Sequence, residues 1–137
     1  MSTLIKNCKI ISPDREIQNA CIEIENDYIK ATYPDSGNIP NSLNCIDAKG
    51  KMAVPGFIDI HTHGAKGYDT TFAKTGKDIA NIAETKLNEG VTSFCPTTLT
   101  APKEQLFRAA NAVAEYKKDE VFSKIAGLHL EGPFLSL

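Results

Sequence analysis

The chain has 137 residues, of which 42% are hydrophobic and 23% charged, and its formal net charge is −2. It contains neither a basic cluster of the kind that binds nucleic acid nor an apolar run long enough to span a membrane. Its first residues lack the charged and apolar segments of a secretory leader. We therefore expect a cytoplasmic protein with no nucleic-acid or membrane partner.

The N-terminal part of the sequence alternates between short apolar runs and turn-forming residues. Residues 3–11 and 20–25 have the β-branched and aliphatic character of strands, and the Ser-Pro-Asp sequence at 12–14 is a turn signal between them. A further strand follows the Asn-Asp turn signal at 26–27. We predict a small antiparallel β-unit over residues 1–50, followed by a different kind of domain.

The segment Pro55–His63 reads P-G-F-I-D-I-H-T-H and carries two histidines two residues apart. Residues two apart in a strand point to the same face. In a regular strand Asp59, His61 and His63 would share one face, and the neighbouring isoleucines would face the other way. Neutral imidazole is a good ligand for zinc, iron and related divalent ions. The segment thus predicts a metal site, the alternative being two polar histidines in a surface loop.

The chain that follows alternates between helix and strand patterns. Apolar residues at helical spacing predict a helix near 76–89, and a β-branched and aromatic run predicts a strand at 91–99. A second helix is predicted from about Pro102 to Tyr116. With a strand before and after, residues 54–131 have a β-α-β-α-β order, which indicates a parallel sheet.

The last predicted strand ends in the sequence G-L-H-L-E-G-P-F. Leu128 and Leu130 would face one way and His129 and Glu131 the other. Taken alone, Glu131 is interpreted as an exposed carboxylate at a strand end. Every parallel strand ends at the same edge of the sheet, so Glu131 can converge there with the histidine pair, which favours the metal site. We interpret His129 as a polar residue of the interior beside the site, not as a direct ligand.

Three ordered motifs resemble those of the amidohydrolases and, among them, the N-acetylglucosamine-6-phosphate deacetylases. They are D-A-K-G-K-M-A-V-P-G-F-I-D-I-H-T-H-G at Asp47–Gly64, G-V-T-S-F-C-P-T at Gly90–Thr97 and G-L-H-L-E-G-P-F at Gly127–Phe134. The first motif is similar to those of many amidohydrolases. The third distinguishes the deacetylases, which use a glutamate in this setting where many relatives use a modified lysine.

The resemblance implies a fold, a metal site and a reaction. Residues 51–137 would form part of a metal-dependent-hydrolase TIM (β/α)8 barrel, with about three βα steps, and the preceding β-unit would be part of a β-sandwich domain. His61, His63 and Glu131 would bind one or two divalent metal ions, zinc or iron. The reaction would be hydrolysis of the acetamido group of N-acetylglucosamine-6-phosphate, a sugar phosphate, to glucosamine-6-phosphate and acetate in amino-sugar catabolism. The family resemblance also suggests a homodimer.

The resemblance further implies that this chain carries no catalytic acid or base. In the deacetylases this acid and base is an aspartate. The aspartate and two further metal-binding histidines lie in segments that would follow Leu137. We therefore expect a truncated enzyme that is inactive alone. Two alternatives stay open, a noncatalytic metal-binding or assembly fragment and another amidohydrolase of the dihydroorotase or dipeptidase type. Glu131 in its H-L-E-G-P-F setting argues against the second.

Overall fold

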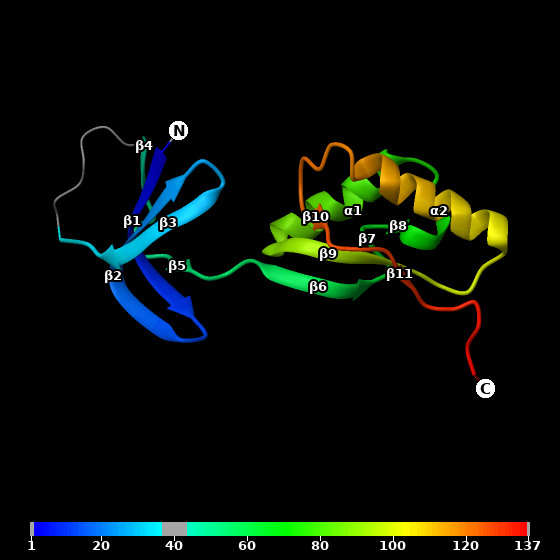
Figure 1. Ribbon diagram of the computed structural model, residues 1–137, viewed down its shortest axis with the longest axis horizontal. Coiled ribbons are helices and arrows are strands. Elements are labelled where there is room, and N and C mark those ends of the chain that lie inside the picture. The colour runs from blue at the N-terminus through cyan, green and yellow to red at the C-terminus, as the bar shows by residue number, and fades with distance from the viewer. Residues whose placement is uncertain (1, 37–43, 137) are drawn as a thin grey trace. The chain divides into compact units, whose positions relative to one another are not determined.

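The computed structural model describes residues 2–36 and 44–136. The chain divides into two compact units, Met1–Pro55 and Gly56–Leu137 (Figure 1). This division lies slightly beyond the boundary near residue 50 that the turn signals indicated. Among the described residues, no helix combines the length and the apolar character needed to cross a membrane.

The first unit is a sheet with the strand order β3-β2-β1-β4, in which β5 also pairs with β1. The pairs β1–β2 and β2–β3 are antiparallel, but β4 and β5 run parallel to β1. The sheet is therefore mixed, and the prediction of a wholly antiparallel unit is wrong. Turn signals reveal pairing between neighbours in sequence, whereas the direction of β4 and β5 depends on long-range pairing. The strands are β1 Ser2–Ser12, β2 Arg15–Glu25, β3 Tyr28–Pro34, β4 Asn44–Asp47 and β5 Met52–Ala53.

Alternating side chains of β1 and β2 form the core of this first unit. Cys8 and Ile10 on β1 are buried with Ala20 and Ile22 on β2, and Cys8 lies opposite Ala20 in the register. Because alternate residues of a strand point to one face, each strand contributes one apolar row to this core. The predicted turn between β2 and β3 is confirmed at Asn26, whose φ of 56° suits the left-handed conformation that asparagine tolerates.

The second unit contains a parallel sheet centred on β9. Strand β6 pairs with one part of β9, and β10 and then β11 pair with successive parts of it, all in parallel. The predicted order of strands and helices is confirmed, and the hairpin β7–β8, the 3-10 helix η1 and strand β10 were not predicted. The elements are β6 Phe57–Thr62, β7 Gly64–Ala65, β8 Tyr68–Asp69, η1 Thr70–Phe72, α1 Gly76–Asn88, β9 Val91–Thr98, α2 Lys103–Tyr116, β10 Lys124–Ile125 and β11 His129–Leu130.

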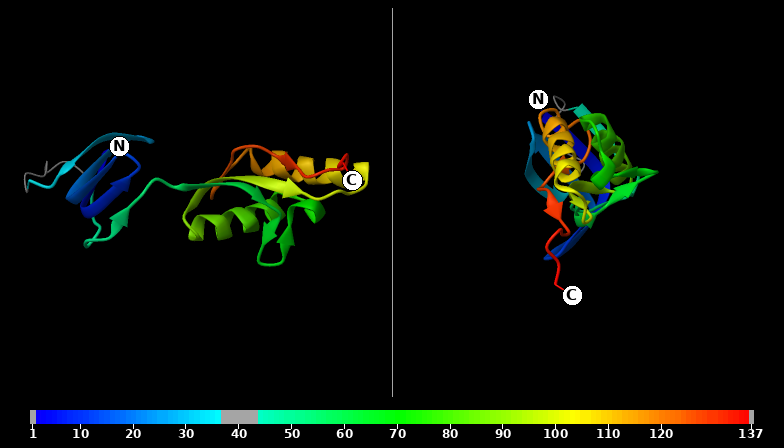
Figure 2. Two further views of the ribbon diagram at one scale, coloured as in Figure 1. Left: turned by 90° about the horizontal axis from the view of Figure 1, so that it is seen from below. Right: turned by 90° about the vertical axis from the view of Figure 1, so that its right-hand side faces the viewer.

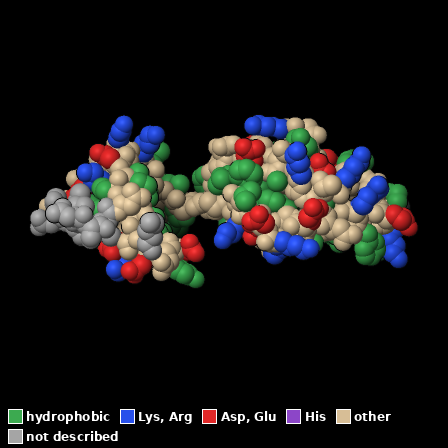
Figure 3. Space-filling view, turned by 90° about the horizontal axis from the view of Figure 1, so that it is seen from above, with side chains coloured by type: hydrophobic (Ala, Val, Ile, Leu, Met, Phe, Trp, Pro, Cys, Tyr) green, Lys and Arg blue, Asp and Glu red, His purple; other side chains and the backbone are tan. Residues whose placement is uncertain are grey.

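Both helices of this unit cover the same face of the sheet (Figures 1 and 2). Phe94 of β9 is fully buried beneath them and packs with Ile79 and Ile82 of α1 and with Val113 and Tyr116 of α2. Burial of such large apolar side chains is the main source of stability in a unit of this size. On the outer surface, acidic and basic side chains are interspersed (Figure 3).

A capping box fixes the start of α1. The Asp78 carboxylate accepts hydrogen bonds from the backbone N–H groups of Lys74 at 2.8 Å and Thr75 at 3.2 Å. These bonds satisfy donors that the helix itself leaves unpaired. The hydrogen bond from the Lys74 backbone is the largest influence on this carboxyl, and the pKa of Asp78 lies below its ordinary value.

We expect the substitution Asp78→Ala to lower the free energy of unfolding by about 1 kcal/mol at pH 7, as measured by urea denaturation. A carboxyl whose pKa is lowered by folding stabilises the protein above its ordinary pKa of 3.8 and loses that contribution as the pH falls below it. The difference between wild type and Asp78→Ala should therefore shrink in acid. Glu84→Ala, at an exposed position of the same helix, is the control. Equal effects of the two substitutions at pH 7 would contradict the capping role.

Candidate metal centre

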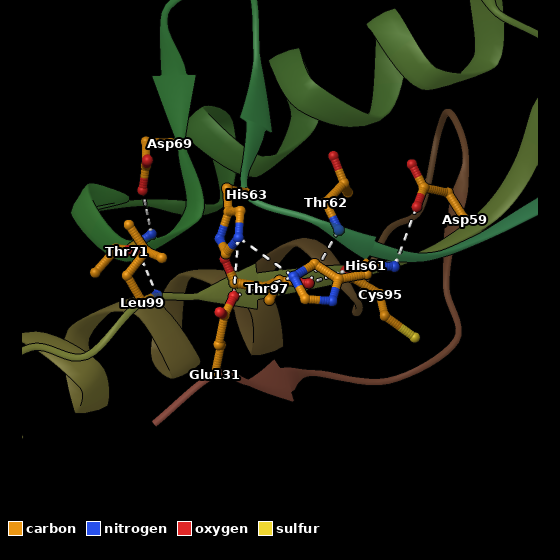
Figure 4. Close-up of polar contacts among 10 residues, drawn as sticks. All are labelled: Asp59, His61, Thr62, His63, Asp69, Thr71, Cys95, Thr97, Leu99 and Glu131. Atoms are coloured by element: carbon orange, nitrogen blue, oxygen red, sulfur yellow. Dashed lines mark hydrogen bonds and ion pairs between the residues drawn. The ribbon is translucent and has the colours of Figure 1, made fainter. Parts of the chain in front are cut away.

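Three side chains with metal-ligating atoms meet at the C-terminal ends of parallel strands (Figure 4). His61 lies near the end of β6, His63 directly follows that strand, and Glu131 directly follows β11. The Nε2 atoms of the two histidines are 3.3 Å apart, and each lies 3.1 Å from Oε2 of Glu131. The structure therefore brings together the three residues that the sequence singled out.

An irregularity in β6 separates these histidines from the residues before them. The register with β9 shifts between Asp59 and Thr62, which is the signature of a β-bulge. Before the shift, Asp59 lies opposite Phe94 and so faces the helices, and Ile58 lies opposite Ser93 on the other face. After it, His61 and His63 point toward one another (Figure 4).

Asp59 therefore does not share a face with the histidines, and that prediction is wrong. Its Oδ2 atom lies 3.2 Å from Nζ of Lys86 on α1. Ile58 and Ile60, which regular alternation would place on the face opposite the histidines, are 65% and 71% exposed. Regular alternation assigned these faces, and the bulge breaks the alternation.

A hydrogen bond at one ring nitrogen of His63 leaves the other ring nitrogen available to bind a metal ion. Its Nδ1 atom lies 3.2 Å from the carbonyl oxygen of Thr97 on β9. A carbonyl only accepts, so Nδ1 carries a hydrogen, and in the neutral ring Nε2 then presents its lone pair toward Glu131. This is the ring orientation that metal-bound histidines adopt when a second group holds their other nitrogen. Sequence reasoning did not identify Thr97, because the contact uses its backbone.

His129 lies beside the cluster and outside it. Its ring meets the His61 ring edge to face, with 4.6 Å between the ring centroids. Its Nδ1 atom is buried and has no hydrogen-bond partner among the described residues. Its place on β11, opposite Thr97 of β9, brings the His129 ring next to the His61 ring. The structure thus positions His129 as packing support for the His61 ring.

The three-residue cluster has the dimensions of a metal site. Ligand atoms about 2.0–2.1 Å from a tetrahedral zinc ion are roughly 3.3 Å from one another, and the three donor atoms here are separated by 3.1 to 3.3 Å. Two imidazoles and a carboxylate also suit zinc, iron, manganese or cobalt. The side chains of His61, His63 and Glu131 are 46%, 35% and 40% exposed, so one side of the cluster is open to further ligands. No other such cluster occurs in the described ranges.

Residues 52–137 match the sequence model of the amidohydrolase family. The chain belongs to this family. Across its full length it is 30% identical to the N-acetylglucosamine-6-phosphate deacetylase of Haemophilus influenzae, and it covers 35% of that protein. Its amidohydrolase fold is similar to the crystal structure of the deacetylase from Pasteurella multocida, with a TM-score of 0.89, 29% identity and coverage of 100% of this chain and 36% of that one.

A second deacetylase structure adds information about a ligand. This structure is a mutant of the Mycobacterium smegmatis deacetylase in complex with N-acetyl-D-glucosamine-6-phosphate. The match covers 98% of this chain and 34% of the Mycobacterium chain, with 25% identity and a TM-score of 0.75. The chain described here therefore spans about a third of the length of the deacetylases that it matches. Within that third lie both histidines and the glutamate of the cluster.

Lys86 holds the strand that carries the histidines against α1. Burial, the largest single influence on its ammonium group, lowers the pKa of Lys86, but hydrogen bonds to Glu89 and Asp59 outweigh it and the net pKa is raised. The Lys86 side chain is only 13% exposed and that of Asp59 26% exposed. Water therefore screens this pair less than an ordinary surface ion pair.

We expect Lys86→Met to reduce the free energy of unfolding by about 1–3 kcal/mol, because it leaves the half-buried Asp59 carboxylate without its charged partner. A group whose pKa is raised by folding stabilises the protein below its ordinary pKa, which is 10.5 for this lysine, and loses that contribution as the pH rises further. The deficit measured by urea denaturation should therefore be constant near neutrality and shrink in strong alkali. Lys118→Met, at an exposed position, is the matched control. If Lys86→Met left the free energy of unfolding unchanged, the role of the pair would be contradicted.

Proposed function

We propose that this chain forms the first part of a metal-dependent amidohydrolase whose whole protein deacetylates N-acetylglucosamine-6-phosphate. The products would be glucosamine-6-phosphate and acetate. The observation that carries this proposal is the cluster of His61, His63 and Glu131 at the ends of parallel strands, with separations that suit a divalent metal ion. The similarity of the whole chain to deacetylases supports the choice of substrate.

The proposal includes a fold larger than the described units. Strands β6, β9 and β11 are parallel, and the two helices between them cover one face of the sheet. Such strand–helix steps are the repeating pattern of a TIM (β/α)8 barrel. Enzymes with this fold place their working residues at the C-terminal ends of the strands, where the cluster lies. We propose that the first unit is correspondingly part of a β-sandwich domain.

The residues of the cluster would each have a defined role. His61 and His63 would hold a zinc or iron ion through Nε2, and Glu131 would bind it through its carboxylate. Such an ion supplies Lewis acidity, which polarises an amide carbonyl and makes water a better nucleophile near neutral pH. The carbonyl of Thr97 holds the His63 ring so that Nε2 remains directed at the cluster.

The chain by itself supplies only part of a catalytic site. Apart from the three clustered side chains, the described residues near them offer His129, which is packed against His61, and Asp59, which is engaged with Lys86. Both side chains therefore already contact other residues of the chain. We therefore propose that the acid–base group and the sugar-phosphate contacts come from the remaining two-thirds of the length of the relatives.

A chimaera tests this proposal. In it, this chain replaces the matching 35% of the Haemophilus influenzae deacetylase. We expect the chimaera to release acetate from N-acetylglucosamine-6-phosphate in the presence of zinc or ferrous iron, and the 137-residue chain alone to release none. His61→Ala and Glu131→Ala should each lower kcat/KM by about 100-fold or more, because each removes a ligand of the ion that supplies the Lewis acidity.

Glu104→Gln, at an exposed position of α2, is the control for the loss of a carboxylate and should leave the activity unchanged. Circular dichroism and thermal unfolding establish that each chimaera is folded. A folded chimaera that releases no acetate would contradict the proposed reaction, and activity on dihydroorotate or a dipeptide instead would assign the chain to another amidohydrolase reaction. Metal-dependent activity of the 137-residue chain alone would contradict its proposed incompleteness.

A further inference from the structure

We propose that Thr97 is a positioning residue that fixes the segment His61–His63 in its metal-binding arrangement through both its backbone carbonyl and its side-chain hydroxyl. The inference rests on the metal site proposed above. Thr97 lies on β9, next to the strand that carries the histidines, and its side chain is fully buried. Its two oxygen atoms contact two consecutive residues of that segment, Thr62 and His63.

The carbonyl oxygen of Thr97 acts on the ring of His63. It accepts a hydrogen bond from Nδ1 at 3.2 Å, so the hydrogen of the neutral ring resides on Nδ1. The lone pair of Nε2 is then available at 3.1 Å from Glu131 and 3.3 Å from His61. A histidine without such a partner is free to rotate or to place its hydrogen on the nitrogen that must bind the ion.

The hydroxyl group of Thr97 acts on the backbone between the two histidines. It accepts a hydrogen bond from the N–H of Thr62 at 3.0 Å and donates its own hydrogen to the carbonyl of Cys95 at 3.0 Å. The bond to Cys95 orients the hydroxyl, so its lone pair faces Thr62. Thr62 is itself only 8% exposed, and water has little access to replace this bond.

The position of this bond gives it a specific effect. The register of β6 against β9 is irregular between Asp59 and Thr62, so the regular pairing that fixes other residues of the strand is interrupted beside His61. The Thr97 hydroxyl fastens the chain at the end of this irregularity. It therefore sets the separation of the two histidine rings, which ordinary strand geometry does not set there.

The adjacent residue provides a matched comparison. Thr98 is also fully buried, but its hydroxyl has no hydrogen-bond partner among the described residues. Replacing either threonine by valine exchanges its hydroxyl for a methyl group of similar size and keeps the backbone. Only Thr97→Val removes a hydroxyl that contacts the histidine segment.

Zinc binding to the 137-residue chain, measured by isothermal titration calorimetry, tests the proposal. We expect Thr97→Val to weaken zinc affinity by about 10-fold or more, the usual effect of losing a group that orients a metal ligand. Thr97→Ser, which keeps the hydroxyl, should restore affinity, and Thr98→Val should leave it unchanged. The visible absorption spectrum of bound Co²⁺ should change in Thr97→Val alone, because the positions of the ligands change.

The outcomes separate this inference from the metal site on which it rests. If the wild-type chain does not bind zinc, the site itself is wrong and the inference with it. If the wild-type chain binds and Thr97→Val binds equally well, only the inference is overturned, even if that variant melts at a lower temperature. If Thr97→Val does not fold, Thr97→Ala takes its place: a loss of zinc affinity that Thr97→Ser does not show supports the inference, and an unchanged affinity overturns it.

Discussion

Three electron-pair donors of the second unit face one another at the ends of its parallel strands. His61 Nε2, His63 Nε2 and Glu131 Oε2 are separated by 3.1 to 3.3 Å. With the hydrogen of a neutral His63 on Nδ1, His63 Nε2 and the ionised Glu131 carboxylate are both acceptors, so a cation or a hydrogen from His61 Nε2 between them is favourable. A divalent ion fits the ligand types and spacing that the cluster offers.

Strands distant in sequence make this convergence possible. Glu131 is 70 residues from His61, yet both sit at strand ends on either side of β9. The α1 and α2 layer packs around Phe94 of β9, the strand that lies between β6 and β11. Lys86 of α1 ties β6 to that helix through its ion pair with Asp59. The helical layer thus supports the strands that carry the donors, although it contributes none of them.

Much of this arrangement was predictable from the sequence, because periodic apolar residues identify helices and parallel strands end at one edge. Helix α1 was expected near residues 76–89 and spans Gly76–Asn88, and His61, His63 and Glu131 meet as parallel topology requires. The direction of Asp59 was not predictable, because a β-bulge has no clear sequence signal. The roles of backbone atoms were hidden as well, since any residue at position 97 would present a carbonyl. The parallel pairing of β4 with β1 depends on contacts between distant residues that no local pattern encodes.

The most direct test of this account is X-ray diffraction from crystals of the chain grown with zinc, with data collected at the zinc absorption edge. The account predicts an anomalous peak about 2.0–2.2 Å from Nε2 of His61, Nε2 of His63 and a carboxylate oxygen of Glu131. A fully ordered cluster with no zinc peak at saturating zinc, or a peak bound through other residues, would contradict it.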